Sequence, residues 1–282
     1  MTPAVTPSRL AYVAGIVVAT CVVVVIAWEA IGGHGDATPT PTATQPFALE
    51  LVGNRAFSTA EIRAEVAHLE TPLVDGSGAV DDDALQREVL LISAFYWDHG
   101  HANVKIGTPR FERSRNTIVI QVDEGPSFTI DTVTVKGHLI GDEHHHLAMI
   151  HVRPGELFSR KRIADDRETL ATFYEDQAYA YADVRPTTQI DVARRTIGLA
   201  FEIEPGTPAS FERIDVVNHS KTSDDAIRGA IAVAAGQPYN ATRLVETKRR
   251  VAALGRFRDV AVSIRRGSTE ALVVATIEVS DE

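Results

Sequence analysis

One pattern of residues recurs three times in this chain at a spacing of about 80 residues, and it restricts the fold more than any other feature. In each copy an extended segment with two alternating apolar residues is followed by a residue that favours turns. The three segments end in Leu49-x-Leu51-x-Gly53, Val133-x-Val135-x-Gly137 and Ile214-x-Val216-x-Asn218. A unit copied three times predicts a tandem array of small modules that offers surfaces to a partner, and such arrays are rarely enzymes.

Each copy is predicted to run strand, helix, helix, strand, strand. Ser58-Thr59-Ala60-Glu61 is a capping box that begins the first helix of the first copy. Asp81, Ser159 and Asn240 are predicted to begin the second helices, and in the third copy Leu244, Val251 and Leu254 are expected to face inward. The closing hairpins are predicted at Val104–Phe111 with Thr117–Val122, Val184–Val192 with Thr196–Ile203, and Val260–Ile264 with Ala271–Val279. We place the modules at residues 46–126, 127–207 and 208–282.

Charge and cysteine content exclude several classes of function. The formal net charge of −10 argues against a nucleic-acid partner, because nucleic-acid binding favours an excess of Lys and Arg. Cys21 is the only cysteine, so no disulfide forms within the chain. The sequence shows no nucleophile triad, phosphate loop or dinucleotide fingerprint. We therefore expect a protein that is not an enzyme and that takes no cofactor.

The segment from Leu10 to Trp28 is 19 residues long and carries no charge. As a helix it would span roughly 28 Å, close to the hydrocarbon thickness of a bilayer. Arg9 precedes it, and no Lys or Arg follows until Arg55, so the positive-inside rule places residues 1–9 in the cytoplasm and residues 29–282 outside it. The alternative is a cleaved signal peptide. Residues 29–45 are rich in Gly, Pro and Thr and are predicted to be a flexible linker.

Two groups of polar residues resemble functional sites, and each has a simpler structural explanation. His144-His145-His146 suggests a metal, but successive residues of a helix point about 100° apart and do not converge on one ion. We predict that the three histidines form a solvated surface and that the chain has no metal site. Asp165 and Asp166 follow the basic run 160–162 and predict a mixed-charge helix surface.

The order of elements and the turns resemble the polypeptide-transport-associated (POTRA) domain, in three copies over residues 46–282. The matching features are the apolar-x-apolar-x-Gly strand, the turns Arg153-Pro154-Gly155 and Gly236-Gln237-Pro238, and the closing turns such as Glu124-Gly125-Pro126. The pattern is most similar to the periplasmic arm of the outer-membrane barrel-assembly (BamA/TamA-like) family. The resemblance implies an α+β fold of three tandem β-α-α-β-β domains, each with a three-stranded mixed sheet covered by two helices.

The resemblance also implies a function. Family members hold unfolded or nascent outer-membrane proteins and dock accessory subunits, so we expect a periplasmic binding scaffold in outer-membrane protein assembly or translocation. The sequence ends at Glu282, before the family's β-barrel would begin. The expected partners are therefore such clients, or a separate barrel or assembly subunit, with the membrane contacted through Leu10–Trp28. The expected place is the cell envelope, either as a single-pass membrane protein or, after signal cleavage, at the outer membrane. The alternative function is an inner-membrane-anchored structural or cell-division protein, since one septal division protein carries such a domain.

In this family the first strand of each hairpin lies at a sheet edge, where an extended peptide adds through main-chain hydrogen bonds. The candidate partner-binding residues on these edges are Val104, Ile106, Val184, Ile190, Val260, Val262 and Ile264. Pro109 and Pro186 each remove a backbone donor from the first and second edges. We therefore predict that the third edge, Val260–Ile264, is the most open.

Overall fold

A computed structural model describes residues 48–66, 81–255 and 257–281. All described residues belong to one compact unit, which spans residues 46–282. The predicted membrane segment Leu10–Trp28 and the predicted linker 29–45 lie outside the described residues. Among the helices that are described, none is both long enough and apolar enough to cross a bilayer.

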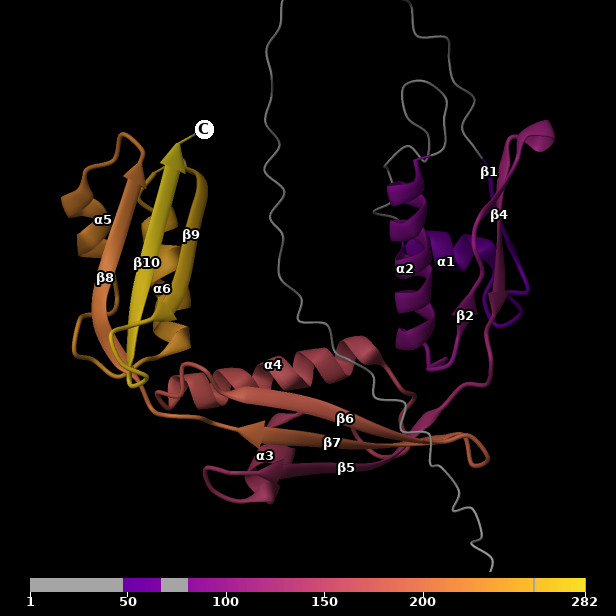
Figure 1. Ribbon diagram of the computed structural model, residues 1–282, viewed down its shortest axis with the longest axis horizontal. Coiled ribbons are helices and arrows are strands. Elements are labelled where there is room, and N and C mark those ends of the chain that lie inside the picture. The colour runs from indigo at the N-terminus through magenta and orange to yellow at the C-terminus, as the bar shows by residue number, and fades with distance from the viewer. Residues whose placement is uncertain (1–47, 67–80, 256, 282) are drawn as a thin grey trace, which may run out of the picture. The chain divides into compact units, whose positions relative to one another are not determined.

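The described residues form three repeats, each with one sheet and two α-helices (Figure 1). Repeat 1 contains β1 (Ala48–Val52), α1 (Thr59–Glu65), α2 (Asp82–Asp98), β2 (Lys105–Ile106), β3 (Arg110–Glu112), the 3₁₀ turn η1 (Arg113–Arg115) and β4 (Thr117–Asp123). Repeat 2 contains β5 (Thr129–Gly137), α3 (Glu143–Met149), α4 (Arg160–Asp176), β6 (Asp183–Asp191) and β7 (Thr196–Glu204). Repeat 3 contains β8 (Ser210–His219), α5 (Asp224–Ala230), α6 (Ala241–Ala252), β9 (Phe257–Arg266) and β10 (Leu272–Asp281). The predicted α+β order is confirmed.

The last strand of each repeat lies at the centre of its sheet. β7 pairs with β5 in parallel and with β6 antiparallel, and β10 pairs with β8 and β9 in the same two ways. In β7 the residues Ile197, Leu199, Phe201 and Ile203 are buried and alternate with more exposed ones, as expected for a strand with one face on the core. Phe201 and Ile277 in these strands are fully buried. The mixed sheets that the sequence predicted are therefore present.

Helix starts follow the predicted caps. The side chains of Asp81, Ser159 and Asn240 each accept a hydrogen bond from the backbone N–H three residues on. Ser58 and Glu61 form the complete capping box at α1. These contacts satisfy first-turn donors that the helices themselves leave unpaired.

Two predicted elements differ from the structure. The segment Val104–Phe111 is not one strand, because Gly107 and Pro109 interrupt it between β2 and β3, and Val104 lies in the preceding turn. Helix α6 ends at Ala252, about one turn earlier than its counterparts, so Leu254 is 42% exposed instead of facing inward.

Gly53 and Gly137 end the first strands of repeats 1 and 2 with φ of 100° and 107°. A Cβ at either position would collide with a carbonyl oxygen of the central strand, that of Val122 or Ile203. Glycine is therefore required by both the dihedral angle and the space. Asn218 takes the place in repeat 3 and holds the turn with its side chain, which donates to the carbonyl of Thr222.

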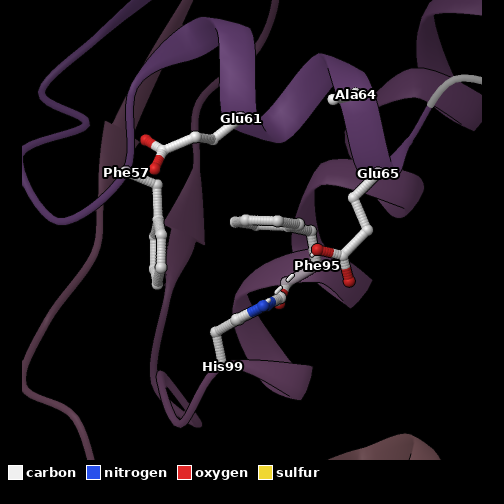
Figure 2. Close-up of a pocket in the computed structure, with 6 residues that line it drawn as sticks. All are labelled: Phe57, Glu61, Ala64, Glu65, Phe95 and His99. Carbon is white, nitrogen blue, oxygen red and sulfur yellow. Dashed lines mark hydrogen bonds and ion pairs between the residues drawn. The ribbon is translucent and has the colours of Figure 1, made fainter.

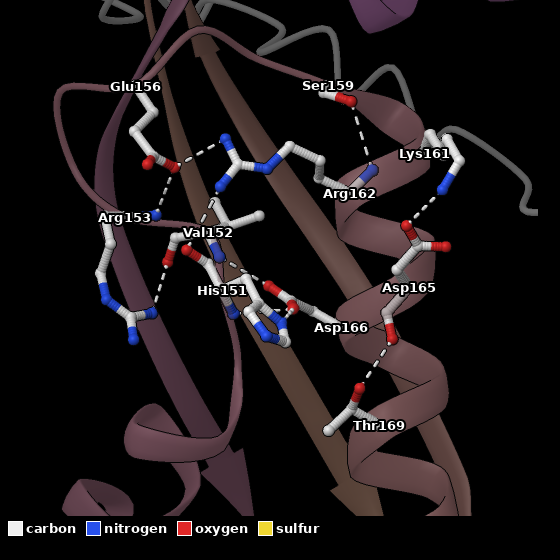
Figure 3. A network of polar contacts seen from close by, with 10 residues as sticks. All are labelled: His151, Val152, Arg153, Glu156, Ser159, Lys161, Arg162, Asp165, Asp166 and Thr169. Atoms are coloured by element: carbon white, nitrogen blue, oxygen red, sulfur yellow. Dashed lines mark hydrogen bonds and ion pairs between the residues drawn. The ribbon is translucent and has the colours of Figure 1, made fainter.

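The seventh residue of each long helix is a buried polar side chain, and this corrects the prediction for Asp166. That residue is fully buried, and its carboxylate accepts from the backbone N–H groups of His151 at 2.7 Å and Val152 at 2.8 Å (Figure 3). In repeat 3 the hydroxyl of Thr247 accepts from the N–H of Ala232. Glu88 holds the position in repeat 1, where burial raises the pKa of its carboxyl. Each side chain that binds backbone in this way fastens the long helix to the segment before it.

The histidine triplet is only partly solvated. His144 and His145 are exposed, but His146 is fully buried. Its Nδ1 lies 2.7 Å from the carbonyl of Asp142 and its Nε2 lies 2.8 Å from the hydroxyl of Tyr174. Both ring nitrogens are thus used within repeat 2, so His146 has a structural role.

Adjacent repeats are joined twice by the same contact. Asp98, the last residue of α2, accepts from the backbone N–H of Lys161 at 2.7 Å. Asp176, the last residue of α4, accepts from the backbone N–H of Thr242 at 2.9 Å. Lys161 and Thr242 are each the second residue of the next repeat's long helix. One repeat therefore supplies a helix cap to the following one.

Candidate partner-binding edge

Each three-stranded sheet has two edges, and the edge formed by the first strand is partly occupied by its own chain. Near its start β5 exchanges hydrogen bonds with the turn before α4, from Gly155 N–H to the Ile130 carbonyl and from Ile130 N–H to the Glu156 carbonyl. β8 is covered in the same way, from Gly236 N–H to the Phe211 carbonyl and from Phe211 N–H to the Gln237 carbonyl. The opposite edges, formed by β2 with β3, β6 and β9, are the candidates for adding a strand.

β9 offers the longest continuous edge of these three. It pairs with β10 from Phe257 to Arg266, and the hairpin closes with Gly267 N–H donating to the Leu272 carbonyl at 2.8 Å. Hydrogen-bonded and non-hydrogen-bonded pairs alternate along an antiparallel ladder. Counting back from Gly267, Val260, Val262 and Ile264 therefore direct their N–H and C=O groups away from β10.

The side chains of these same residues lie on the helix face of the sheet. Val260 is 5% exposed, and Val262 and Ile264 pack against the core of repeat 3. Side chains anchored in this way hold the backbone in an extended conformation, so the row of donors and acceptors is preorganised for a strand. Within the described residues, none of these three N–H groups donates to a backbone carbonyl outside the sheet.

The equivalent edge in repeat 2 is blocked at two points. Pro186 has no N–H, and because β6 is paired with β7 along its whole length, that nitrogen must face the open side. Val184 lies two residues away and faces the same side. Its carbonyl already accepts from Nε of Arg167, at 3.2 Å. Val184 and Ile190 thus belong to an edge with one donor missing and one acceptor occupied.

The edge in repeat 1 is short. β2 has two residues and β3 has three, and the N–H of Gly107 between them is bonded to the carbonyl of Gln121 at 2.8 Å. Ile106 is in β2, but Val104 is outside any strand. A partner strand would find few consecutive free groups here.

One flank of α6 runs beside the β9 edge. Arg167, which reaches the β6 edge, is the eighth residue of α4, and the eighth residue of α6 is Lys248. Residues at i, i+4, i+7 and i+11 share a helix face, so Ala241, Val245 and Ala252 lie on the same flank as Lys248. Val245 is 69% exposed. The flank combines small and apolar side chains with one lysine, and it suits the alternate side chains of an added strand.

The structure places Val260, Val262 and Ile264 together on one open edge, and separates them from the residues predicted in repeats 1 and 2. Arg167 was missed. The sequence signal was an arginine at a helix position where repeat 3 has lysine. This signal indicates a contact with the edge strand only if the helix is already known to lie over that strand. Among the described residues no group of three His, Cys, Asp or Glu side chains has the arrangement of a metal site.

Comparison with known proteins gives a family match over all three repeats. A family model described as POTRA, surface antigen variable number repeat, matches residues 48–125, 128–206 and 209–280. Among solved structures, the chain is similar to POTRA3-5 of Haemophilus influenzae BamA, with a TM-score of 0.69 and 18% identity. The match covers 83% of this chain and 95% of that one. At this identity the likeness concerns the fold.

Curated relatives carry the name outer membrane protein assembly factor BamA. The protein of Nitratidesulfovibrio vulgaris is 22% identical over 212 residues, which is 72% of this chain and 27% of the relative. That of Neisseria meningitidis is 21% identical over 220 residues, which is 75% of this chain and 28% of the relative. The chain spans just over a quarter of the length of these relatives.

Proposed function

This chain belongs to the POTRA family, and we propose on that basis that it is a periplasmic scaffold in outer-membrane protein assembly. In this proposal it holds partner polypeptides by strand addition at β9. The predicted resemblance to tandem POTRA repeats is confirmed by the match over three repeats. The role in assembly comes from the relatives named as assembly factors. The open edge at Val260, Val262 and Ile264 is the observation that carries the binding mode.

Strand addition suits a scaffold with many clients, because main-chain hydrogen bonds form with any sequence. An incoming strand next to β9 would place every second side chain against the flank of α6 that holds Val245 and Lys248. The clients of this proposal are unfolded outer-membrane proteins, whose strands alternate apolar and polar residues. The cell envelope is the proposed location, with Leu10–Trp28 as the proposed membrane anchor.

The test exploits repeat 2 as a natural template for a closed edge. In the two ladders Pro186 lies opposite Phe201 and Val262 lies opposite Ile277, so the positions correspond. Val262→Pro therefore copies a residue that the same fold already accepts, and it removes one outward donor from β9. The probe is a fluorescent peptide copied from a membrane strand of a bacterial outer-membrane barrel, measured by anisotropy with the full chain.

We expect Val262→Pro to weaken peptide binding at least about fivefold, the equivalent of one main-chain hydrogen bond of about 1 kcal/mol. The matched control is Ile190→Pro, which removes an outward donor from the blocked β6 edge and should leave binding unchanged. The reciprocal double variant Arg167→Lys with Pro186→Val should open β6 and increase the binding capacity. Equal affinity of Val262→Pro and the unmodified chain would refute strand addition at β9.

A further inference from the structure

A pocket of about 470 Å³ lies between α1 and α2 of repeat 1, separate from all three candidate edges (Figure 2). Its lining residues come from the turn before α1, from α1 itself, and from the end of α2. They are Phe57, Glu61, Ala64, Glu65, Phe95 and His99.

Aromatic rings form one wall of the pocket. Phe57 meets Phe95 edge to face, with ring centroids 5.0 Å apart, and meets His99 at 5.1 Å. Phe95 and His99 are stacked at 4.2 Å. Phe95 is buried, whereas Phe57 and His99 are half-buried, so part of the aromatic surface remains open to a guest. The faces of such rings carry a negative electrostatic potential and attract cations.

Two carboxylates form the rim above these rings. Glu61 and Glu65 lie four residues apart on α1, and both side chains line the pocket (Figure 2). A like-charge pair at this spacing destabilises a helix, and α1 has only seven residues to resist it. Hydrogen bonds from Ser58 lower the pKa of Glu61, which keeps that carboxyl ionised. A positive guest would turn this repulsion into attraction.

His99 places a ring nitrogen next to the carboxylate of Glu65. Its Nδ1 lies 2.7 Å from the carbonyl of Phe95, so this nitrogen carries a proton and donates. In the neutral ring Nε2 is then an acceptor, and it faces Oε2 of Glu65 at 3.5 Å. Two acceptors that face each other are satisfied by an N–H placed between or beside them. An N–H group of a guest placed beside both atoms would meet two acceptors.

We propose that this pocket binds a basic side chain, foremost arginine, of a polypeptide partner. A guanidinium is planar, so it can lie on a ring such as Phe57 while its several N–H groups reach Glu65 and Nε2 of His99. Lysine has the charge but neither the plane nor the fork, and it ranks second. The pocket is a second contact for a partner, additional to any strand held at β9. The positive charge of the guest complements the acidic chain, which carries a net charge of −10.

The experiment uses the full chain and two peptides that differ only in charge. The probes are acetyl-Gly-Gly-Arg-Gly-Gly-amide and the same peptide with citrulline, which has the shape of arginine without its charge. The readout is the NMR shift of the Ala64 methyl and of the Phe57 and Phe95 rings, which do not exchange with water. Both titrations are run at pH 8.

We expect the arginine peptide to shift these signals in a saturable way and to bind at least about fivefold more tightly than the citrulline peptide. Glu65→Gln should weaken the arginine peptide about fivefold, roughly the contribution of one exposed ionic contact supported by an aromatic ring. Glu168→Gln, on exposed α4 surface of repeat 2, is the matched control and should change nothing. The proposal is wrong if the two peptides bind equally, if neither binds at 10 mM, or if Glu65→Gln has no effect.

Discussion

The contact between Asp176 and Thr242 gives a prediction in which two electrostatic effects oppose each other. Asp176 ends α4, where the helix dipole disfavours a negative charge by about 0.3–1 kcal/mol. It also accepts from the backbone N–H of Thr242 at 2.9 Å and from the Thr242 hydroxyl at 2.6 Å. Loss of a capping acceptor costs about 0.5–2 kcal/mol, typically near 1. The unfavourable position of Asp176 within α4 is thus offset by the hydrogen bonds that its carboxylate accepts from Thr242 at the start of α6.

Asp176→Ala should therefore make α4 slightly more stable and the start of α6 less stable. We expect the amide of Thr242 to exchange its hydrogen about five times faster, which corresponds to about 1 kcal/mol at that site. The net change in the free energy of unfolding of the whole chain should be smaller, below about 1 kcal/mol, because the two effects partly cancel. Hydrogen exchange read by NMR at single amides separates them, whereas a melting curve does not.

The matched variant is Glu168→Ala, which removes a negative charge from the same helix but makes no contact with repeat 3 in the described structure. Its exchange at Thr242 should equal that of the unmodified chain. Asp98→Ala should produce the corresponding effect at Lys161. If Asp176→Ala leaves exchange at Thr242 unchanged while the chain gains stability, then the carboxylate is not a cap and the reasoning fails.

Three further substitutions test single features of repeat 2. Gly137→Ala should cost at least about 2 kcal/mol by urea unfolding, because its φ is +107° and the new Cβ would strike the Ile203 carbonyl; a cost below 0.5 kcal/mol would contradict this. Asp166→Asn should cost about 2–3 kcal/mol, since the amide has one oxygen to accept from the N–H groups of His151 and Val152, the second of them buried, and an unchanged urea midpoint would count against it. Burial, with the nearby charges of Glu168 and Asp176, raises the pKa of Glu175 to about 7. The protonated Glu175 is therefore the form that the folded chain favours, and its contribution to stability is complete below about pH 4.5 and lost as pH rises through 7. Glu175→Gln should stabilise the chain at pH 8 and have no effect at pH 4.

The features predicted correctly from sequence are those fixed by neighbours close along the chain. A cap such as Ser159 needs only the N–H three residues later. The two strand-ending glycines could be identified from the positive φ that the following turn needs, although the carbonyl that leaves no room for a Cβ comes from the distant central strand. The early end of α6 also had a signal. Asn240 and Gly255 are 15 residues apart, whereas Asp81 and Gly100 are 19 apart, so the third helix is one turn shorter. Counting that interval would have removed Leu254 from the predicted core.

The features that were missed depend on partners that the local sequence does not reveal. Aspartate is a residue type usually found on the surface. Asp166 is nevertheless buried, because backbone N–H groups 14 and 15 residues earlier donate hydrogen bonds to its carboxylate. His146 sits in a polar run, and its burial depends on Tyr174, 28 residues away. Helical spacing identifies the helix face that an acid or a histidine occupies. It does not show whether a hydrogen-bond donor or acceptor from another segment lies next to that face.

The three edges show where repeats of one fold are free to diverge. Outward backbone groups contribute nothing to the core, so a proline or a covering arginine can be gained or lost at an edge with little effect on folding. An unprotected edge, however, invites unwanted pairing with other chains, and proteins normally block it. Repeat 2 does so with Pro186 and Arg167, and repeat 1 with the break at Gly107 and Pro109. β9 is ten residues long and has neither device. Because the other two repeats close this edge, we propose that the open edge of β9 is the one that binds a partner strand.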